Sequence, residues 1–410
     1  MGESEAPDGL LEREIVVCVG CGGVGKTTVA ATLALEAARR GRRVVVLTID
    51  PARRLADALG VAELSNEPQE ISREALAAVG AAGSGRLFAL MLDTRRTFDD
   101  LVMRLAESPE VRARIMDNRI YQHASDALAG SIEYSAMERL HELHRCNDFD
   151  LVVVDTPPAQ HALEFLEAPQ RLLEFLDSRL VQMLIHPAFA AGRFGFRLFQ
   201  RGTRKVLQVL ERVSGFTFLE EISEFLLAFE GMAEGFRERA RAVRAVLLSP
   251  KTSFVLVSGP ERESLEQARL FLDRLEATRV PLAGVLLNRV RHWPGAAGPP
   301  ARTEPDHASV EKLAEALRRS EGVDFAAETA ARAAADVAKG YAALVRRDGD
   351  ATQSLRERTA RERRFWVEIP ELRTDVHDLA GLAQVADRIF EKNRIFEKNA
   401  EEPPLVHTTG

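Results

Sequence analysis

The sequence predicts an α/β protein with a mostly parallel, doubly wound sheet and an inserted helical subdomain. Short, continuous apolar runs rich in Val, Ile and Leu recur along the 410 residues, and most are followed by a helical pattern. Such runs are typical of parallel strands that are covered by helices on both faces. A long helical block interrupts the alternation, and a hydrophobic content of 46% is enough for a substantial core. We therefore expect residues 1–410 to form a single domain with helical insertions.

Seven apolar runs are expected to form strands, and a polar, Gly or Pro residue follows each of them. They span residues 15–19, 44–49, 87–92, 151–154, 254–257, 285–287 and 366–369. Ligands of parallel sheets bind at the carboxyl ends of the strands. This chain places Gly20, Asp50, Asp155 and Asn288 there, so this edge of the sheet is the expected ligand site.

The segments outside this alternation are predicted to be helices, one loop and a tail. Residues 97–147 and 160–248 are expected to form helical insertions that make a client or partner subdomain. The Pro- and Gly-rich residues 292–308 are expected to be a flexible loop, and residues 309–364 a charged helical region. The hexapeptide RIFEKN occurs twice over residues 388–399 and lengthens the last helix, whereas residues 400–410 are expected to be a disordered tail.

Composition excludes several classes of protein. The net charge of −7 argues against a chain that binds nucleic acid. Three scattered cysteines without a CxxC pair argue against a disulfide scaffold and against a zinc site. No export segment and no run of about 18 apolar residues is present. We expect a cytoplasmic protein, with a peripheral membrane location as an open alternative.

The strongest motif is a phosphate-binding loop that follows the first strand and opens a helix. It fits the pattern GxxxxGK[ST] with Gly20, Cys21, Gly22, Gly23, Val24, Gly25, Lys26, Thr27 and Thr28. Glycines let successive backbone N–H groups surround a phosphate, Lys26 reaches the terminal phosphates, and Thr27 can ligate Mg²⁺. Lys26 is also the only lysine in the first 204 residues, which fits a role that an Arg fork cannot fill. The motif predicts a P-loop NTPase.

Two aspartates at strand ends complete the predicted site. A P-loop needs a second acid near the metal, and Asp155 follows a buried strand in the place where that acid is expected; a purely structural Asp is the alternative. Asp50 also ends a strand and could orient the attacking water, with Asp57 in a supporting position. Thr27, Asp50 and Asp155 are therefore the candidate magnesium residues, and Lys26 and Asp50 the candidate catalytic residues.

Five segments in the same order resemble one family. They are GGVGKTT, TIDPARRLADALG, FDLVVVDTPPAQHALEFLEAP, SFVLVSGPERESLEQARLFLDRL with GVLLNRV, and VEIPELRTDVHDLAGL. The chain thereby resembles the arsenite-translocating (ArsA) and tail-anchored-protein targeting ATPases. These belong to the deviant Walker A class that includes MinD and the nitrogenase iron protein. The similarity looks closest to a bacterial branch of ArsA-like ATPases.

The resemblance implies a Mg²⁺-dependent ATPase. It implies purine contacts from Asn288, Arg289, Pro370 and Leu372. It also implies a dimer that closes over two nucleotides and moves a hydrophobic helical subdomain that carries or chaperones an apolar, membrane-protein segment. A MinD-like, nucleotide-dependent switch at the membrane is the alternative function.

Cys21 departs from the family pattern GKGGVGKTT, in which a first lysine reaches the partner's nucleotide. Three explanations remain open: a slow homodimer, an Arg such as Arg53 or Arg54 in that role, or a heterodimer in which this chain is a weakly active subunit beside a lysine-bearing paralogue. The thiol itself could be a redox switch at a helix N-terminus, or a small residue tolerated in a turn.

Two surfaces in the second helical insertion are candidate partner sites. Helical spacing places Phe218, Ile222, Phe225, Phe229, Met232 and Phe236 on one stripe. The stripe either receives an apolar client helix or packs on sister helices. An acid-free run carries Arg193, Arg197, Arg201, Arg204 and Lys205; it either contacts an anionic membrane or forms a solvated helix face.

Overall fold

A computed structural model describes most of the chain. It describes residues 7–50, 54–81, 83–118, 121, 132–157, 174, 178, 232, 234–278, 280–294, 307–319 and 326–401. The basic run at 193–205, most of the Phe stripe and Arg53 therefore lie outside the described residues.

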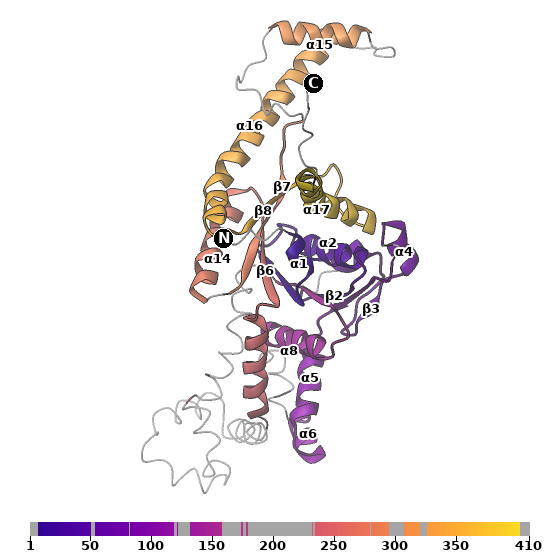
Figure 1. The fold of residues 1–410 in the computed structure, drawn as a ribbon, viewed down its shortest axis with the longest axis vertical. Coiled ribbons are helices and arrows are strands. Elements are labelled where there is room, and N and C mark those ends of the chain that lie inside the picture. Colours follow the sequence, from indigo (N-terminus) through magenta and orange to yellow (C-terminus); the bar gives the residue numbers. More distant parts are fainter. Residues whose placement is uncertain are drawn as a thin grey trace, which may run out of the picture.

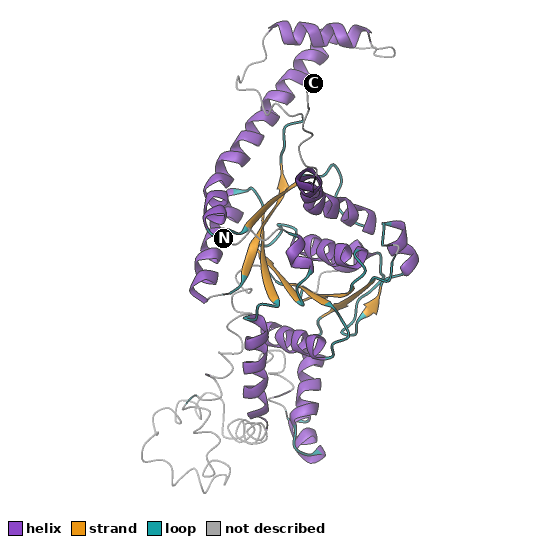
Figure 2. Ribbon diagram, viewed as in Figure 1, coloured by secondary structure: helices purple, strands orange, loops and turns teal. Residues whose placement is uncertain are grey.

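An eight-stranded sheet forms the centre of the described structure (Figure 2). Its strands are β1 (Ile15–Gly20), β2 (Arg43–Thr48), β3 (Gln69–Glu70), β4 (Arg86–Met91), β5 (Leu151–Asp155), β6 (Thr252–Ser258), β7 (Leu282–Val290) and β8 (Phe365–Pro370). The order across the sheet is β3-β4-β2-β5-β1-β6-β7-β8. All neighbours pair in parallel except β3, which pairs antiparallel with β4. The predicted α/β fold is confirmed.

Each of the seven predicted runs forms a strand. Their predictability follows from burial, since every residue of β1, β5 and β6 is buried, and a strand buried on both faces is mostly a continuous apolar run. The short edge strand β3 was not predicted. Its two residues, Gln69 and Glu70, are polar and only partly covered, so no apolar run marks it.

Helices cover both faces of the sheet (Figure 1). On one face α2 (Lys26–Arg39) packs across the central strands and beside α17 (Leu379–Glu401). Arg39 joins these helices through an ion pair of 2.8 Å with Asp387. The short helices α1 (Asp8–Leu11) and α3 (Arg54–Leu59) contact α2, and α4 (Arg73–Ala78) lies between β3 and β4 in the chain. On the other face α14 (Arg262–Thr278) and α16 (Ala327–Arg361) cover β6, β7 and β8.

Three helices lie in the described part of the first predicted insertion. They are α5 (Thr94–Leu105), α6 (Pro109–Met116) and α8 (Ile132–Arg145). Asp93 and Ser108 cap α5 and α6 through hydrogen bonds from backbone N–H groups. Residues 234–247 form a further helix that runs beside these at one end of the molecule (Figure 1).

The other end carries a second helical projection. There α15 (His307–Arg319) lies across the end of the long helix α16 (Figure 1). Helix α15 begins within the predicted loop 292–308, of which residues 292–294 and 307–308 are described. Helix α17 includes both RIFEKN copies and ends at Glu401, so the predicted disordered tail is shortened at its start.

Within the described ranges, none of the helices combines the length and apolar character needed to span a membrane.

Candidate functional site

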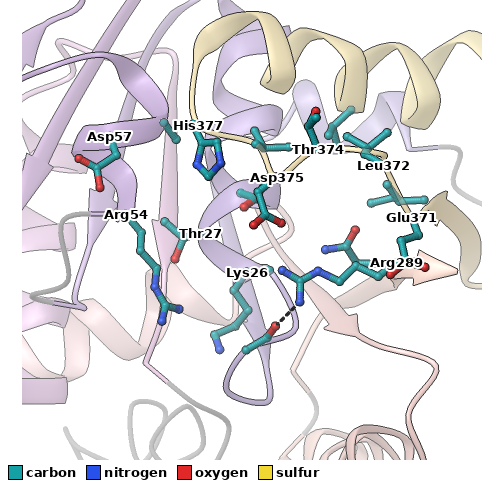
Figure 3. A pocket seen from close by; sticks show the side chains of 18 of the residues that line it. Lys26, Thr27, Arg54, Asp57, Arg289, Glu371, Leu372, Thr374, Asp375 and His377 are labelled. Atoms are coloured by element: carbon teal, nitrogen blue, oxygen red, sulfur yellow. Dashed lines mark hydrogen bonds between the residues drawn. The ribbon is translucent and has the colours of Figure 1, made fainter.

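A cavity of about 860 Å³ opens at the carboxyl ends of the strands, between the phosphate-binding loop and the segment after β8 (Figure 3). Of the predicted site residues, it is lined by Gly22, Gly23, Gly25, Lys26, Thr27, Thr28, Asp50, Asn288, Arg289, Pro370 and Leu372. The predicted residues Gly20, Cys21, Val24 and Asp155 do not line it. The cavity thus joins segments that are up to about 360 residues apart in the chain.

Glycine is required at two places in the loop by close approach of other groups. A Cβ atom on Gly20 would lie 2.0 Å from the carbonyl oxygen of Val257 in the neighbouring strand. Gly25 has a φ of 93° and a Cβ there would lie 2.3 Å from Nδ2 of Asn288. Both sites exclude larger side chains, and the loop is therefore built against β6 and the end of β7.

Lys26 begins α2 with a buried side chain whose amino group is held by the loop itself. Its Nζ donates a hydrogen bond of 2.7 Å to the carbonyl oxygen of Cys21. Burial lowers the pKa of Lys26, and the nearby Asp155 carboxylate opposes this effect. A charged phosphate entering the cavity would favour the protonated amine in the same way.

Asp155 lies beneath the loop, at the end of β5. Its Oδ2 accepts a hydrogen bond of 3.0 Å from the hydroxyl group of Thr48, whereas Oδ1 is buried without a hydrogen-bond partner among the described residues. Burial raises the pKa of Asp155 to about 6, although the hydroxyl groups of Thr27 and Thr48 act against the shift. A buried oxygen without a partner, beside a Thr hydroxyl, fits an acid that faces the hydration shell of a hard cation such as Mg²⁺.

Asp50, Arg54 and Asp57 line the side of the cavity formed by α3 and the segment before it. In Figure 3 the guanidinium group of Arg54 points toward the end of the cavity where Lys26 and Thr27 lie. Arg54 is exposed. It can therefore approach a ligand at the phosphate-binding loop without losing a buried contact.

The end of β7 contacts the phosphate-binding loop directly. Asn288 donates a hydrogen bond of 2.9 Å from Nδ2 to the carbonyl oxygen of Val24. Arg289 donates one of 3.4 Å from Nη1 to the carbonyl oxygen of Gly23 (Figure 3). The two side chains that were predicted to contact a purine therefore also hold the loop.

The segment after β8 contributes more of the cavity wall than was predicted. Besides Pro370 and Leu372, the wall contains Glu371, Thr374, Asp375, Val376 and His377. Asp375 and His377 extend from this segment toward the first turn of α2 (Figure 3). A signal was present in the sequence, because polar residues directly follow the strand end at Pro370.

Cys21 is directed away from the cavity. Its side chain is buried and its Sγ lies 3.6 Å from the carbonyl oxygen of Ser264 in α14. Burial raises the pKa of the Cys21 thiol, and the nearby Lys26 only partly offsets this effect. A raised pKa disfavours the thiolate, so the structure gives no support to a redox switch and favours a small residue packed in a turn.

Met232 and Phe236 of the predicted stripe are packed inside the structure, as the alternative of packing on sister helices expects. Both residues are buried, with exposures of 1% and 0%. The Phe236 ring lies 6.0 Å from that of Phe98 in α5 and 6.1 Å from that of Tyr134 in α8. Phe218, Ile222, Phe225 and Phe229 lie outside the described residues.

Comparison with known proteins is consistent with this site. The chain matches the ArsA_ATPase family, described as anion-transporting ATPase, over residues 13–294. It is 24% identical to ATPase GET3 of Malassezia globosa over 314 residues, covering 76% of this chain and 82% of the relative. It is 22% identical to a putative arsenical pump-driving ATPase 2 of Aquifex aeolicus over 273 residues, covering 66% and 78%. It is 26% identical to an ATPase ASNA1 homolog of Cryptosporidium parvum over 273 residues, covering 66% and 63%.

Proposed function

The chain belongs to the ArsA family of anion-transporting ATPases, and from that premise we propose that it binds and hydrolyses MgATP in the cavity at the carboxyl ends of its strands. The phosphates would lie in the loop between β1 and α2, and the purine against Asn288, Arg289 and the segment from Pro370 to Leu372. The cavity has the size expected for a ligand of this kind.

The arrangement of Lys26 and Asp155 around the glycine loop carries this proposal. The amino group of Lys26 is already placed over the loop through the carbonyl of Cys21, where it can exchange that contact for a phosphate oxygen. Helix α2 directs its N-terminus into the same space, so backbone N–H groups and the helix dipole favour an anion there.

The metal site that fits these residues uses Thr27 and Asp155, with Asp50 nearby. Bound Mg²⁺ would neutralise charge that develops on the phosphates during transfer. Thr27 would supply its hydroxyl group, and Asp155 would hold the hydration shell through Oδ1, which has no hydrogen-bond partner among the described residues. Asp50, which also lines the cavity, would orient the attacking water.

We extend the proposal to the helices at one end of the molecule. In a dimer, closure over nucleotide would move α5, α6, α8 and the helix at 234–247, because α5 follows β4 directly and α8 contacts β5. Such movement would serve to carry or chaperone an apolar, membrane-protein segment. The resemblance to targeting ATPases supports this role.

The burial of Cys21 favours a second candidate function, that of a weakly active subunit. A cation at this position would reach outward, whereas the Cys21 side chain contacts Ser264 of the same chain. The loop therefore supplies only Lys26 as a cation. A chain of this kind would hydrolyse ATP slowly by itself and gain activity from a paralogue that provides the second cation.

The first test replaces the two candidate catalytic residues separately. Lys26→Ala is expected to weaken MgATP binding by at least tenfold, because the buried cation at the phosphates is lost. Asp50→Asn is expected to bind MgATP normally and to hydrolyse it about 10²-fold or more slowly. Binding is measured by calorimetry and turnover by phosphate release. Lys251→Ala removes an exposed lysine that pairs with Glu14 and is the matched control.

Equal turnover of Asp50→Asn and wild type would exclude the proposed role of Asp50. Unchanged MgATP binding by Lys26→Ala would place the nucleotide elsewhere. In that case the proposal for the cavity fails, although the family assignment stands.

A further inference from the structure

Residues 288–293, here called the connecting segment, join the phosphate-binding loop to the long helix α16. At one end, Asn288 and Arg289 bind the carbonyl oxygens of Val24 and Gly23. Arg289 has a φ of 60°, a conformation that costs free energy for a residue with a side chain and is found where other contacts enforce it. The pairing of β7 with β8 also shifts register between Leu287 and Val290. The segment is therefore held in an irregular form at the loop.

The other end of the connecting segment rests on α16. The Tyr341 hydroxyl group donates a hydrogen bond of 3.1 Å to the carbonyl oxygen of His292. The Tyr341 ring also lies 6.2 Å from the ring of Trp293. These contacts hold His292 and Trp293, which lie just beyond β7, against the middle of α16 and outside the cavity.

Arg291, at the centre of the segment, bridges two acids that belong to different parts of the molecule. Its Nη1 lies 3.1 Å from Oδ2 of Asp348 on α16, and its Nε lies 3.3 Å from Oε2 of Glu371 on the cavity wall. Asp348 is 1% exposed. The Arg347 side chain, 65% exposed, is 3.6 Å from the other oxygen of Asp348. A buried carboxylate needs a close cation, and Arg291 supplies the shorter and better covered of the two contacts.

The cavity wall is thus linked to α16 through the Arg291 side chain, and the contacts of Tyr341 with His292 and Trp293 add a second link from the connecting segment. The backbone N–H of Glu371 also donates a hydrogen bond of 3.0 Å to the carbonyl oxygen of Val290. A ligand that moves Glu371, Asn288 or Arg289 is therefore expected to shift Arg291 relative to Asp348. The guanidinium group of Arg291 has separate N–H donors at Nη1 and Nε, so it can hold both acids at once.

We propose that Arg291 is a positioning residue that couples nucleotide in the cavity to α16, through its ion pairs with Glu371 and Asp348. The inference rests on the proposed function in one respect, which is that the nucleotide occupies this cavity. Helix α16 would then report nucleotide occupancy to the projection that it forms with α15. This output lies at the opposite end of the molecule from α5 and α6 (Figure 1).

The test compares two variants of this bridge with a control on the same helix. Arg291→Gln removes the cation. Asp348→Asn removes the acid on α16, and Asp348 does not line the cavity. The control is Arg358→Gln. It cuts ion pairs of 2.7 Å and 2.9 Å that join α16 to Asp273 and Glu276 of α14, away from the cavity. Each purified full chain is tested for its dissociation constant for MgADP and for amide hydrogen exchange of α16 with and without MgADP.

We expect Arg291→Gln and Asp348→Asn each to weaken MgADP binding by about 2- to 30-fold. MgADP should slow exchange around residues 341–352 in the wild type, and both variants should lose this protection. Arg358→Gln should keep the affinity and the protection. The double variant should bind MgADP no more weakly than the more impaired of the two single variants, because both changes break one bridge.

Wild-type affinity and protection in Asp348→Asn would overturn the coupling to α16, even if Arg291→Gln were impaired. Should Arg291→Gln fail to fold, Arg291→Lys keeps the charge without the fork and should lose part of the protection; unchanged protection in it would also count against the coupling. If Lys26→Ala binds MgADP as tightly as the wild type does, the nucleotide does not occupy this cavity. That result would overturn the proposed function and would not by itself count against the ion pairs of Arg291.

Discussion

The Asp155 carboxyl group must be charged to assist a metal, yet it is buried where charge is costly. Burial raises its pKa to about 6, against 3.8 for the unperturbed group. Between these two values the folded chain holds a proton that the unfolded chain has released. Stability from this group is therefore present at low pH and is lost as pH rises through about 6. At neutral pH the ligand-free protein carries an unfavourable charge that a bound cation would compensate.

Asp155→Asn is predicted to remove this pH dependence. Relative to wild type, the free energy of unfolding of Asp155→Asn should rise by about 2 kcal/mol between pH 4.5 and pH 8, because only the wild type ionises a buried acid in this range. Urea unfolding without nucleotide measures the difference. Asp273→Asn, which changes an exposed acid, is the control. A difference that is the same at both pH values would show that Asp155 is already charged at low pH.

At the scale of elements, the helix at 234–247 shows how a residue of the predicted stripe packs in the core. Phe236 is 0% exposed and contacts Phe98 of α5 and Tyr134 of α8. Arg239 forms a hydrogen-bonded ion pair with the buried Glu138 of α8. This helix therefore packs against α5 and α8 of the first insertion.

Phe236→Ala is predicted to destabilise the protein by about 3–5 kcal/mol, because it leaves a cavity between three helices. The measurement is urea unfolding followed by circular dichroism. Leu248→Ala, at a side chain that is 41% exposed, should cost much less. A loss of client binding without any loss of stability in Phe236→Ala would restore Phe236 to the client surface.

Local sequence patterns predict some of these elements and miss others. Buried strands and the loop from Gly20 to Thr28 were predictable, because each follows from local periodicity or from a motif with a fixed geometry. The polar strand β3 was not, since nothing but its pairing with β4 defines it. The bridge from Asp348 to Arg291 joins residues 57 positions apart, and no local pattern encodes such a contact. The direction of the Cys21 side chain depends on its contact with α14, so it could not be predicted from the sequence either.

For the whole molecule, the order of the strands explains how the separate signals converge. Strand β1 lies between β5 and β6, so the loop after it meets Asp155 on one side and the end of β7 beyond β6 on the other. Helical projections extend from opposite ends of the same sheet (Figure 1). A nucleotide at the centre could therefore affect both projections, one through α5 and α8 and the other through Arg291 and α16.

If this chain is an efficient ATPase, a second cation must come from a partner chain or from another side chain of its own, so its assembly matters for turnover. Cys21→Lys is predicted to raise turnover at least tenfold if the chain forms a homodimer that closes over two nucleotides. A cation supplied by a partner can be worth about 10³ to 10⁵ in rate. The new side chain is too long for the buried position against Ser264 and would extend outward instead.

Molar mass by light scattering and turnover by phosphate release, each with and without MgADP and aluminium fluoride, test this prediction together. Cys146→Lys places the same charge at an exposed cysteine and is the control. A dimeric wild type whose turnover is unchanged by Cys21→Lys would show that position 21 does not face the partner's nucleotide. Arg54, whose guanidinium group already points toward Lys26 (Figure 3), would then be the next candidate, and Arg54→Ala should abolish the remaining turnover. If the wild type and Cys21→Lys are both monomers without turnover, a paralogue is instead favoured as the source of the second cation.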